Sequence, residues 1–413
     1  MKQKIMAVGM LVAGILIMAA TPDPGLSDGY WHHPGATRGA PPAHWSKLEA
    51  NLHPEACAQC HQAQFSKWKD SLHAHAYSSG LVGQFPAMGY QQANDCLACH
   101  APLAEQLYPD AKSMNESLKL RLKHASGFDP QADVDKASVP LRHAGVTCAA
   151  CHVRDWQRFG PPPKISGAVG HQDGPEHGGF TATRDFEKSS FCASCHQFPQ
   201  SMAVHGKPLE NTLTEWKKSD FYKRGMTCQQ CHMPDRRHEF RGIHDPDMVR
   251  KGLKIVLRRQ DDGALLRMTS IWIGHAFPTY VTPKILVHAE ALDARGKVLR
   301  SWQWKIMRKV AYDQGWKELS DTRLMPGETR GFLASPLPDA TANVHYRITV
   351  EPDYFYKSVY HSLLSDDLNQ LAEAHIKRAV RRAEHDDYVL FDALLPIKNE
   401  SEINMNKSRP RRS

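Results

Sequence analysis

A five-residue pattern, Cys-x-x-Cys-His, occurs five times in this chain and constrains its fold more than any other feature. This pattern is the attachment signature of c-type haem, in which two thiols three positions apart bond to one edge of the porphyrin. The histidine that follows then lies under the ring and supplies an axial nitrogen to the iron. The pattern predicts five covalent haems, held by Cys57 and Cys60, Cys96 and Cys99, Cys148 and Cys151, Cys192 and Cys195, and Cys228 and Cys231. The predicted proximal iron ligands are His61, His100, His152, His196 and His232.

Zinc sites, disulfides and thioredoxin-like redox sites also use paired cysteines, and the sequence argues against each of them. The motifs contain all ten cysteines of the chain, so no further cysteine is left for a disulfide. A thioredoxin-like site needs one motif in a βαβ context, which the sequence lacks. Histidine makes up 24 of the 413 residues. Chance would place a histidine after all five cysteine pairs roughly once in a million times. We therefore expect haem at these sites.

The first twenty residues have the composition of an export signal. Lys2 and Lys4 form a basic start, a continuous apolar run follows over residues 5–20, and Pro22 and Pro24 come next. This run is shorter than the stretch of about twenty residues that a bilayer span needs. The sequence predicts a signal peptide over residues 1–20, with an uncleaved N-terminal anchor as the alternative. Covalent haem attachment of this kind occurs outside the bacterial inner membrane, so we expect a periplasmic protein.

The net charge does not indicate a nucleic-acid partner. The formal charge is +8, and removal of a signal that contains Lys2 and Lys4 leaves +6. Each ferric haem with two propionates adds about −1, so five haems bring the mature protein close to neutral. The expected partners are redox proteins of the periplasm, with peripheral or N-terminal membrane association as an addition. The basic residues near the motifs are candidate partners of haem propionates: Arg154, Arg158, Lys164, Arg236 and Arg237.

The motifs define a pentahaem domain over residues 51–252, after an extended lead-in over residues 21–50. Successive motifs begin 39, 52, 44 and 36 residues apart. So few residues cannot build a separate protein core around each haem, and the haems must supply much of the buried apolar surface. We therefore expect a mainly helical, loop-rich wrapper around closely packed haems. An apoprotein should not fold, because cofactor binding and folding are then one process.

Beyond residue 252 the sequence pattern becomes that of a β-domain. The predicted strands cover residues 254–257, 265–273, 284–292, 298–307 and 344–350, and turn signals lie at 293–297 and 313–315. Residues 253–360 are predicted to form a small antiparallel β-sandwich. A helical segment is predicted over 361–397 and a basic disordered tail over 398–413. The apolar stripe of the predicted helix comprises Leu368, Leu371, Ala372, Ile376, Ala379 and Val380. The expected fold class is α+β.

The second axial position of each iron decides between electron transfer and catalysis. Eleven further histidines lie between residues 53 and 275, which is enough to make every haem bis-histidine. Bis-histidine iron is low-spin and suits electron transfer, whereas an open position leaves a reactive face. Local sequence provides three candidate distal ligands, with a methionine ligand as the alternative. They are His275 in GHAFP, His143 just before the third motif, and His177 in the glycine-rich loop GPEHGGF.

Several segments resemble the multihaem cytochromes of the cytochrome c-554 type, over roughly residues 50–285. The resemblance depends on CAQCH followed by Phe65, Trp68, Ser71 and His73, on GVTCAACH, on GMTCQQCHMP followed by His238, and on GHAFPT. It implies a pentahaem cytochrome with a C-terminal β-domain that carries the GHAFPT motif. It also implies that His73 and His238 are distal ligands, with His244 as the second choice after the fifth motif.

Helix geometry adds a constraint on His73. At about 100° per residue, His75 shares a helix face with His61, whereas His73 points roughly 120° away from it. His73 is therefore expected to bind the iron of a neighbouring haem. His75 is the competing candidate, and its alternative role is half-buried packing beside the first haem.

Together these patterns predict a periplasmic pentahaem cytochrome c that passes electrons along a chain of haems between redox partners. This role requires no protein nucleophile or acid–base pair, so no catalytic residue is assigned. The alternative is an oxidoreductase that acts on hydroxylamine, nitrite or nitric oxide at a five-coordinate haem. The chain has no Cys-x-x-Cys-Lys motif, which weakens its resemblance to the typical pentahaem nitrite reductase.

Overall fold

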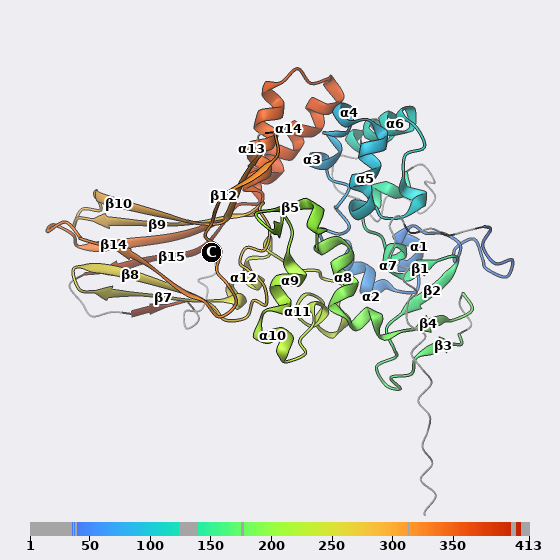
Figure 1. Cartoon of the computed structure of the whole chain (residues 1–413), viewed down its shortest axis with the longest axis horizontal. Coiled ribbons are helices and arrows are strands. Elements are labelled where there is room, and N and C mark those ends of the chain that lie inside the picture. The colour runs from blue at the N-terminus through green and yellow to red at the C-terminus, as the bar shows by residue number, and fades with distance from the viewer. Residues whose placement is uncertain are drawn as a thin grey trace, which may run out of the picture.

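The structure is a computed structural model that describes residues 35, 37, 39–123, 139–174, 177–312, 314–397 and 402–405. The predicted export signal and most of the lead-in lie outside these residues. A helical, loop-rich part lies beside a part made of long strands (Figure 1). The mixed α+β class is therefore as predicted. Within the described ranges, no helix combines the length and the apolar character that a bilayer crossing needs.

Short helices joined by loops make up the haem-motif part of the chain. Most have fewer than the roughly twelve residues that an isolated helix needs, so packing must stabilise them. The α-helices are α1 (Pro54–Ala58), α2 (Gln62–Trp68), α3 (Ser79–Val82), α4 (Phe85–Met88), α5 (Tyr90–His100), α6 (Ala111–Lys123), α7 (Cys148–His152), α8 (Ser189–His196), α9 (Thr212–Lys217), α10 (Asp220–Lys223), α11 (Cys228–His232) and α12 (Pro246–Gly252). The 3-10 helices are η2 (Ala104–Gln106), η3 (Leu141–Ala144), η4 (Arg184–Glu187), η5 (Gln200–Met202) and η6 (Pro234–Arg236). Short strands pair between them: β1 (Val153–Arg154), β2 (Gln157–Gly160), β3 (Gly170–Gln172), β4 (Phe180–Ala182), β5 (Ala203–Val204) and β6 (Lys207–Pro208).

Two four-stranded antiparallel sheets form the predicted sandwich. Their strand orders are β10-β9-β14-β15 and β13-β8-β7-β16, and β11 pairs with β12 in a separate hairpin. The strands are β7 (Leu253–Gln260), β8 (Gly263–Ser270), β9 (Lys284–Leu292), β10 (Val298–Ile306), β11 (Arg308–Tyr312), β12 (Trp316–Asp321), β13 (Thr329–Ala334), β14 (Asn343–Glu351), β15 (Tyr388–Pro396) and β16 (Glu402–Asn404). Apolar side chains from both sheets share one buried core.

Tyr346 on β14 links the two sheets through this core. Its side chain is fully buried, and its hydroxyl donates to the carbonyls of Ala264 at 2.7 Å and Phe332 at 2.9 Å, which belong to the opposite sheet. Because a buried hydroxyl without a partner is costly, these bonds favour one relative placement of the sheets. The sandwich therefore provides a fixed frame for the GHAFPT loop, which leaves it after β8.

Helices α13 (Tyr354–Ser365) and α14 (Gln370–His385) return from the sandwich to the haem-motif part. The predicted stripe on α14 is buried at Ala372, Ile376, Ala379 and Val380, as expected. α14 packs against α3 at Gly83, where an added Cβ would lie 2.7 Å from the Ile376 side chain. The close approach of these helices therefore favours glycine at this position, because a larger residue would displace the Ile376 side chain.

Two predictions about the C-terminal segment are wrong in part, since strands occur there beside helices α13 and α14. Residues 398–401 and 406–413 lie outside the described residues. The predicted helical segment at 361–397 contains strand β15, which pairs with β14 along its length. The predicted disordered tail at 398–413 contains strand β16, which pairs with the edge of β7. In both cases the strand covers backbone groups that a sheet edge would otherwise leave unpaired. This benefit comes from distant partners and is not visible in the local sequence.

Candidate haem-binding site

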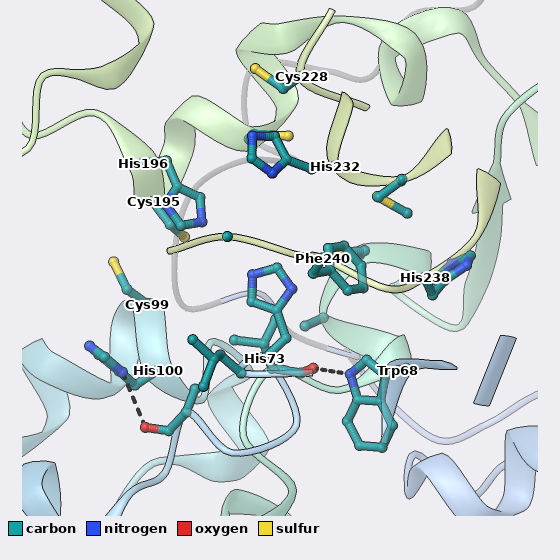
Figure 2. A pocket seen from close by; sticks show the side chains of 18 of the residues that line it. Trp68, His73, Cys99, His100, Cys195, His196, Cys228, His232, His238 and Phe240 are labelled. Atoms are coloured by element: carbon teal, nitrogen blue, oxygen red, sulfur yellow. Dashed lines mark hydrogen bonds between the residues drawn. The ribbon is translucent and has the colours of Figure 1, made fainter. Parts of the chain in front are cut away.

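All five motifs line one continuous internal cavity of about 3400 Å³. Every motif cysteine and every motif histidine contributes to the cavity wall. Figure 2 shows thiols and imidazoles from the second, fourth and fifth motifs directed into this space. Paired thiols with an adjacent imidazole are the donor set that c-type haem requires, so these residues fit the predicted cofactor.

The helices present each motif in the geometry that attachment needs. α5 and α8 end at the motif histidine, whereas α7 and α11 consist of the motif itself. The first motif spans the junction between α1 and α2. Residues three apart on a helix share a face, so both thiols of a motif point to the same side. The sequence therefore forms the sites through local helical structure, before any long-range contact.

Backbone carbonyls orient three of the proximal histidines. A carbonyl only accepts hydrogen bonds, so Nδ1 carries the proton and Nε2 is left to face an iron. The bonds run from His100 to Ala76 at 3.1 Å, from His152 to Phe159 at 2.7 Å, and from His232 to Arg241 at 2.6 Å. Burial holds the pKa of all three below its ordinary value, and that of His152 falls to about 4. Neutral imidazole is the form that binds a metal.

Three candidate distal histidines each lie opposite a proximal one. The ring centroids are 6.1 Å apart for His73 and His196, 6.1 Å for His238 and His152, and 6.3 Å for His275 and His232. Two imidazoles on one iron have centroids about 6.2 Å apart, since each metal–nitrogen bond is about 2.0 Å and each ring centre lies about 1.1 Å behind its nitrogen. Each pair therefore has the spacing of two axial ligands on the same iron.

His73 faces a motif that is far from the first motif in the sequence. It lies opposite the histidine of the fourth motif, in the middle of the cavity (Figure 2). Phe240 packs against its ring at 4.3 Å, and burial lowers its pKa to about 3. Its carbonyl accepts from the amide of Val146 at 2.9 Å, which fixes the backbone. His75 also lines the cavity, but its charge interactions are with Arg121, Arg382 and Asp70.

Backbone carbonyls orient His238 and His275, as they orient three of the proximal histidines. His238 Nδ1 donates to the Arg236 carbonyl at 3.0 Å, and His275 Nδ1 donates to the Ala276 carbonyl at 2.9 Å. Burial lowers the pKa of His275 to about 4. The His275 and His232 rings are nearly parallel, at 12°. Both distal candidates thus direct a neutral Nε2 toward the cavity.

The structure places His177 near the first motif. Its Nδ1 donates to the Gly179 carbonyl at 2.8 Å, and its backbone amide donates to Glu49 at 2.5 Å. Burial first, and then the nearby charge of His177, lower the pKa of His61. In the ranges that the structure describes, neither His61 nor His100 forms a ring contact with another imidazole.

The candidacy of His143 as a distal ligand is wrong in this structure. Its ring is buried outside the cavity wall, stacked on Tyr77 at 5.0 Å. Its Nε2 is 2.8 Å from the Ser117 hydroxyl, so the nitrogen that would face an iron already has a partner. Position next to a motif did not bring this residue to a haem site, because Tyr77 and Ser117 bind its ring elsewhere.

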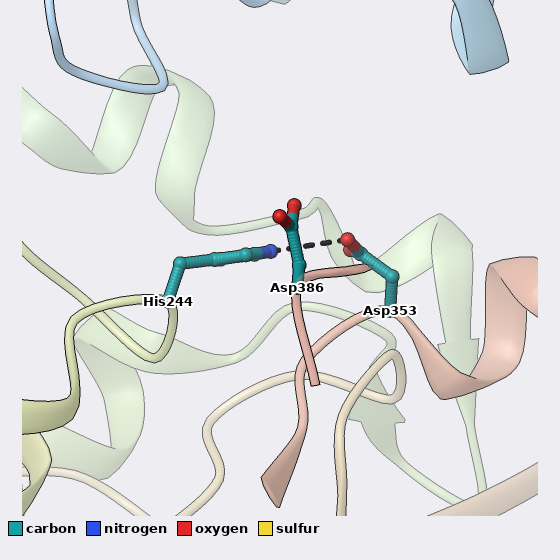
Figure 3. Close-up of side chains that lie close together, drawn as sticks. All are labelled: His244, Asp353 and Asp386. Atoms are coloured by element: carbon teal, nitrogen blue, oxygen red, sulfur yellow. Dashed lines mark hydrogen bonds and ion pairs between the residues drawn. The ribbon is translucent and has the colours of Figure 1, made fainter. Parts of the chain in front are cut away.

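His244 lines the same cavity but has an acidic partner. Its Nε2 lies 3.1 Å from an Asp353 carboxylate oxygen, as Figure 3 shows. Asp386 lies beside them, so that one ligand atom from each of the three residues lies within 4.8 Å of the others. One imidazole and two carboxylates can hold a divalent cation. The local environment of His244 is thus acidic, and its assignment as a haem ligand stays a prediction.

Basic side chains suited to haem propionates line the cavity. Four of the predicted partners do so: Arg158, Lys164, Arg236 and Arg237. The fifth, Arg154, does not, because its guanidinium is buried and donates to backbone carbonyls at 149, 150 and 153. Arg121, Arg378 and Arg382 also line the cavity and were not predicted. α14 supplies two of them, so its docking completes the site.

Thiols of different motifs touch, which places the motifs relative to one another. Hydrogen bonds join Cys57 to Cys148, Cys99 to Cys195, and Cys192 to Cys228. The charge of Cys151 also acts on Cys192 and Cys195. Each of these sulfurs would bond to one edge of a porphyrin, so motifs whose thiols touch would hold their haems close together. The fourth motif is therefore a junction, next to the second, third and fifth, and the first motif adjoins the third.

Comparisons with known proteins agree with this site. Residues 83–245 match the family described as outer membrane cytochrome MtrC/MtrF-like, domains II/IV. Cytochrome c-554 of Nitrosomonas europaea is 25% identical over 153 residues, which cover 34% of this chain and 54% of that protein. A penta-heme cytochrome c552 from Thermochromatium tepidum shares the fold with a TM-score of 0.52 and 20% identity, over 85% of this chain and 100% of that chain. These similarities support a multihaem cytochrome c.

The chain spans about half the length of the cytochrome c-554 that it resembles. The similarity supports covalently bound haem at the motifs. Two polar residues of the candidate haem-binding site were not predicted from the sequence. Glu210 and Tyr280 both contact the fourth-motif histidine, His196. The only sequence signal is that Tyr280 directly follows GHAFPT, and nothing local distinguishes Glu210.

Proposed function

We propose that this chain is a periplasmic pentahaem c-type cytochrome that moves electrons between redox partner proteins. The observation that carries the proposal is the single cavity in which all five motifs converge. Thiol contacts, together with the charge interaction of Cys151 with the fourth-motif thiols, link the motifs in one set. We therefore expect an electron that enters at any haem to reach the others. The three histidine pairs have the spacing of bis-histidine iron, which changes its structure little on reduction and suits electron transfer.

The periplasmic location follows from the apolar N-terminal segment and from the site of covalent haem attachment. Electron transfer needs no substrate pocket beyond the haem edges, and its partners dock through small, transient contacts. No nucleic-acid role is proposed, since bound propionates would use much of the positive charge that lines the cavity. Reductive titration of the oxidised holoprotein is expected to consume five electrons per chain. Sustained turnover of nitrite, hydroxylamine or nitric oxide at a high-spin haem would favour the enzyme alternative instead.

Removal of a distal histidine is expected to change one haem only. The variants His73→Ala, His238→Ala and His275→Ala should each convert one of the five haems from low-spin to high-spin, because an axial nitrogen is lost. Electron paramagnetic resonance of the oxidised protein measures this change. His171→Ala is the matched control, since His171 is largely exposed and lies near Asp173. A variant of the three that keeps the wild-type spectrum would refute that ligand assignment.

A further inference from the structure

The proximal histidine of the fourth motif has a different partner from those of the second, third and fifth. His196 Nδ1 donates to Glu210 Oε1 at 2.9 Å, whereas His100, His152 and His232 donate to backbone carbonyls. The bonded carboxylate is mostly buried, with 17% of its side chain exposed. Although burial opposes it, the Glu210 carboxylate raises the pKa of His196 above its ordinary value. One haem site thus combines an imidazole with a formal negative charge.

The chain holds Glu210 rigidly in this position. The amide of Phe198, two residues after the motif, donates to the Glu210 carbonyl at 2.9 Å. The side-chain amide of Gln197 donates to Asn211 at 3.1 Å. These two bonds tie the segment after the motif to the segment that carries the carboxylate. The fold therefore holds the Glu210 backbone beside the segment that follows His196, within reach of the imidazole.

Tyr280 completes the environment of this carboxylate. Its hydroxyl lies 3.2 Å from His196 Nδ1 and is hydrogen-bonded to Glu210. Its ring lies nearly parallel to that of His196, at 15°. A hydroxyl that donates to a carboxylate withdraws part of its negative charge from the other partner. Glu210 and Tyr280 therefore act on His196 in opposite directions.

We propose that Glu210 lowers the reduction potential of the haem at the junction of the electron pathway. A carboxylate that accepts from the Nδ1–H of a ligating histidine makes the imidazole a stronger electron donor to its metal. It also adds negative charge near the iron, and both effects favour the ferric over the ferrous state. Because the fourth motif adjoins the second, third and fifth, this haem separates the branches of the pathway. Glu210 is thus a positioning residue, and its charge sets how readily the haem at the fourth motif accepts an electron. The inference depends on the proposed function, because it requires haem at the fourth motif.

The substitution Glu210→Gln tests this inference. Glutamine retains an oxygen acceptor of the same shape and removes the charge. In a potentiometric titration of the holoprotein, one midpoint potential should become more positive. We expect the ratio of reduced to oxidised junction haem at a fixed potential to rise about tenfold, which corresponds to about 59 mV for one electron. The low-spin resonance signal of one haem should change with it. Glu187→Gln is the charge-matched control, since Glu187 lines the same cavity but pairs with Arg184 and Arg236.

Tyr280→Phe provides a second, opposite test. Without the Tyr280 hydroxyl, the Glu210 carboxylate accepts a hydrogen bond from His196 and none from the tyrosine. Its full charge then acts on the imidazole, so the same midpoint potential should become more negative. The inference is overturned if both Glu210→Gln and Tyr280→Phe retain five haems and show wild-type potentials. It is also overturned if Glu210→Gln shifts the potentials no more than Glu187→Gln does. Failure of the proposed function would be distinct, because wild-type protein would then lack haem or fail to exchange electrons.

Discussion

Expression in a host that cannot attach haem covalently is expected to yield a chain whose haem-motif part is unfolded. The five motifs line a partly open cavity of about 3400 Å³. At about 24 cal/mol per Å³, an empty cavity of this size would cost on the order of 80 kcal/mol. Water entry reduces this figure, but a tenth of it, about 8 kcal/mol, equals the net stability of an ordinary domain. Circular dichroism and limited proteolysis should show lost helix and rapid cleavage within residues 51–252.

The control is the same chain from a maturation-competent host, which should resist cleavage and unfold at a defined temperature. The double variant Cys148→Ser with Cys151→Ser, made in the maturation-competent host, should lose one haem and keep the other four. Its unfolding temperature should lie below that of the wild-type holoprotein. A haem-free chain with wild-type helix content and cooperative unfolding would contradict the account, because the protein would then need no haem to form its core.

The second large effect is expected for Glu215→Ala. Glu215 on α9 is 9% exposed and pairs with Arg323 at 2.9 Å, which is itself 3% exposed. The same carboxylate accepts from the amide of Ala276 at 3.1 Å, in the loop that carries His275. Breaking a buried ion pair costs about 3–5 kcal/mol, and the lower end applies here because Asp321 still contacts Arg323. The fifth haem should also become partly high-spin, since the His275 loop loses an anchor.

Chemical denaturation of the holoprotein measures the first effect, and electron paramagnetic resonance measures the second. Glu215→Gln should restore much of the spectrum, because its oxygen can still accept from Ala276. Glu373→Ala is the surface control. Glu373 pairs with Lys377 on an exposed face of α14, where loss of an ion pair changes stability by less than about 0.5 kcal/mol. Equal stability of Glu215→Ala and wild type would show that the buried pair does not join the two parts of the molecule.

The motifs could be predicted because their chemistry is local. A spacing of three between thiols, followed by histidine, forms the attachment site on one helical turn, whatever surrounds it. The alternation on β14 and the apolar stripe on α14 were likewise readable, since burial follows a fixed period along one element. These features identify the fold class and the cofactor without any knowledge of distant contacts.

The remaining features depend on contacts between distant segments. His143 and His244 were plausible ligands by position, but Ser117 and Asp353 reach them from other parts of the chain. Strands β15 and β16 exist because distant sheet edges accept them. His375 is fully buried on α14 and hydrogen-bonds to the Leu118 carbonyl at 3.0 Å, a contact that the local sequence does not indicate. Contacts between distant segments determine the positions of these residues and strands, and local sequence patterns do not predict such contacts.

The most direct test of the account is the intact mass of the purified protein under denaturing conditions. Non-covalent cofactors dissociate under these conditions, whereas thioether-bound haem remains on the chain. We predict the polypeptide mass, less any cleaved leader, plus five haem masses. Fewer than five haems, or zinc bound to a colourless chain, would contradict the claim that each Cys-x-x-Cys-His motif holds one haem in the shared cavity.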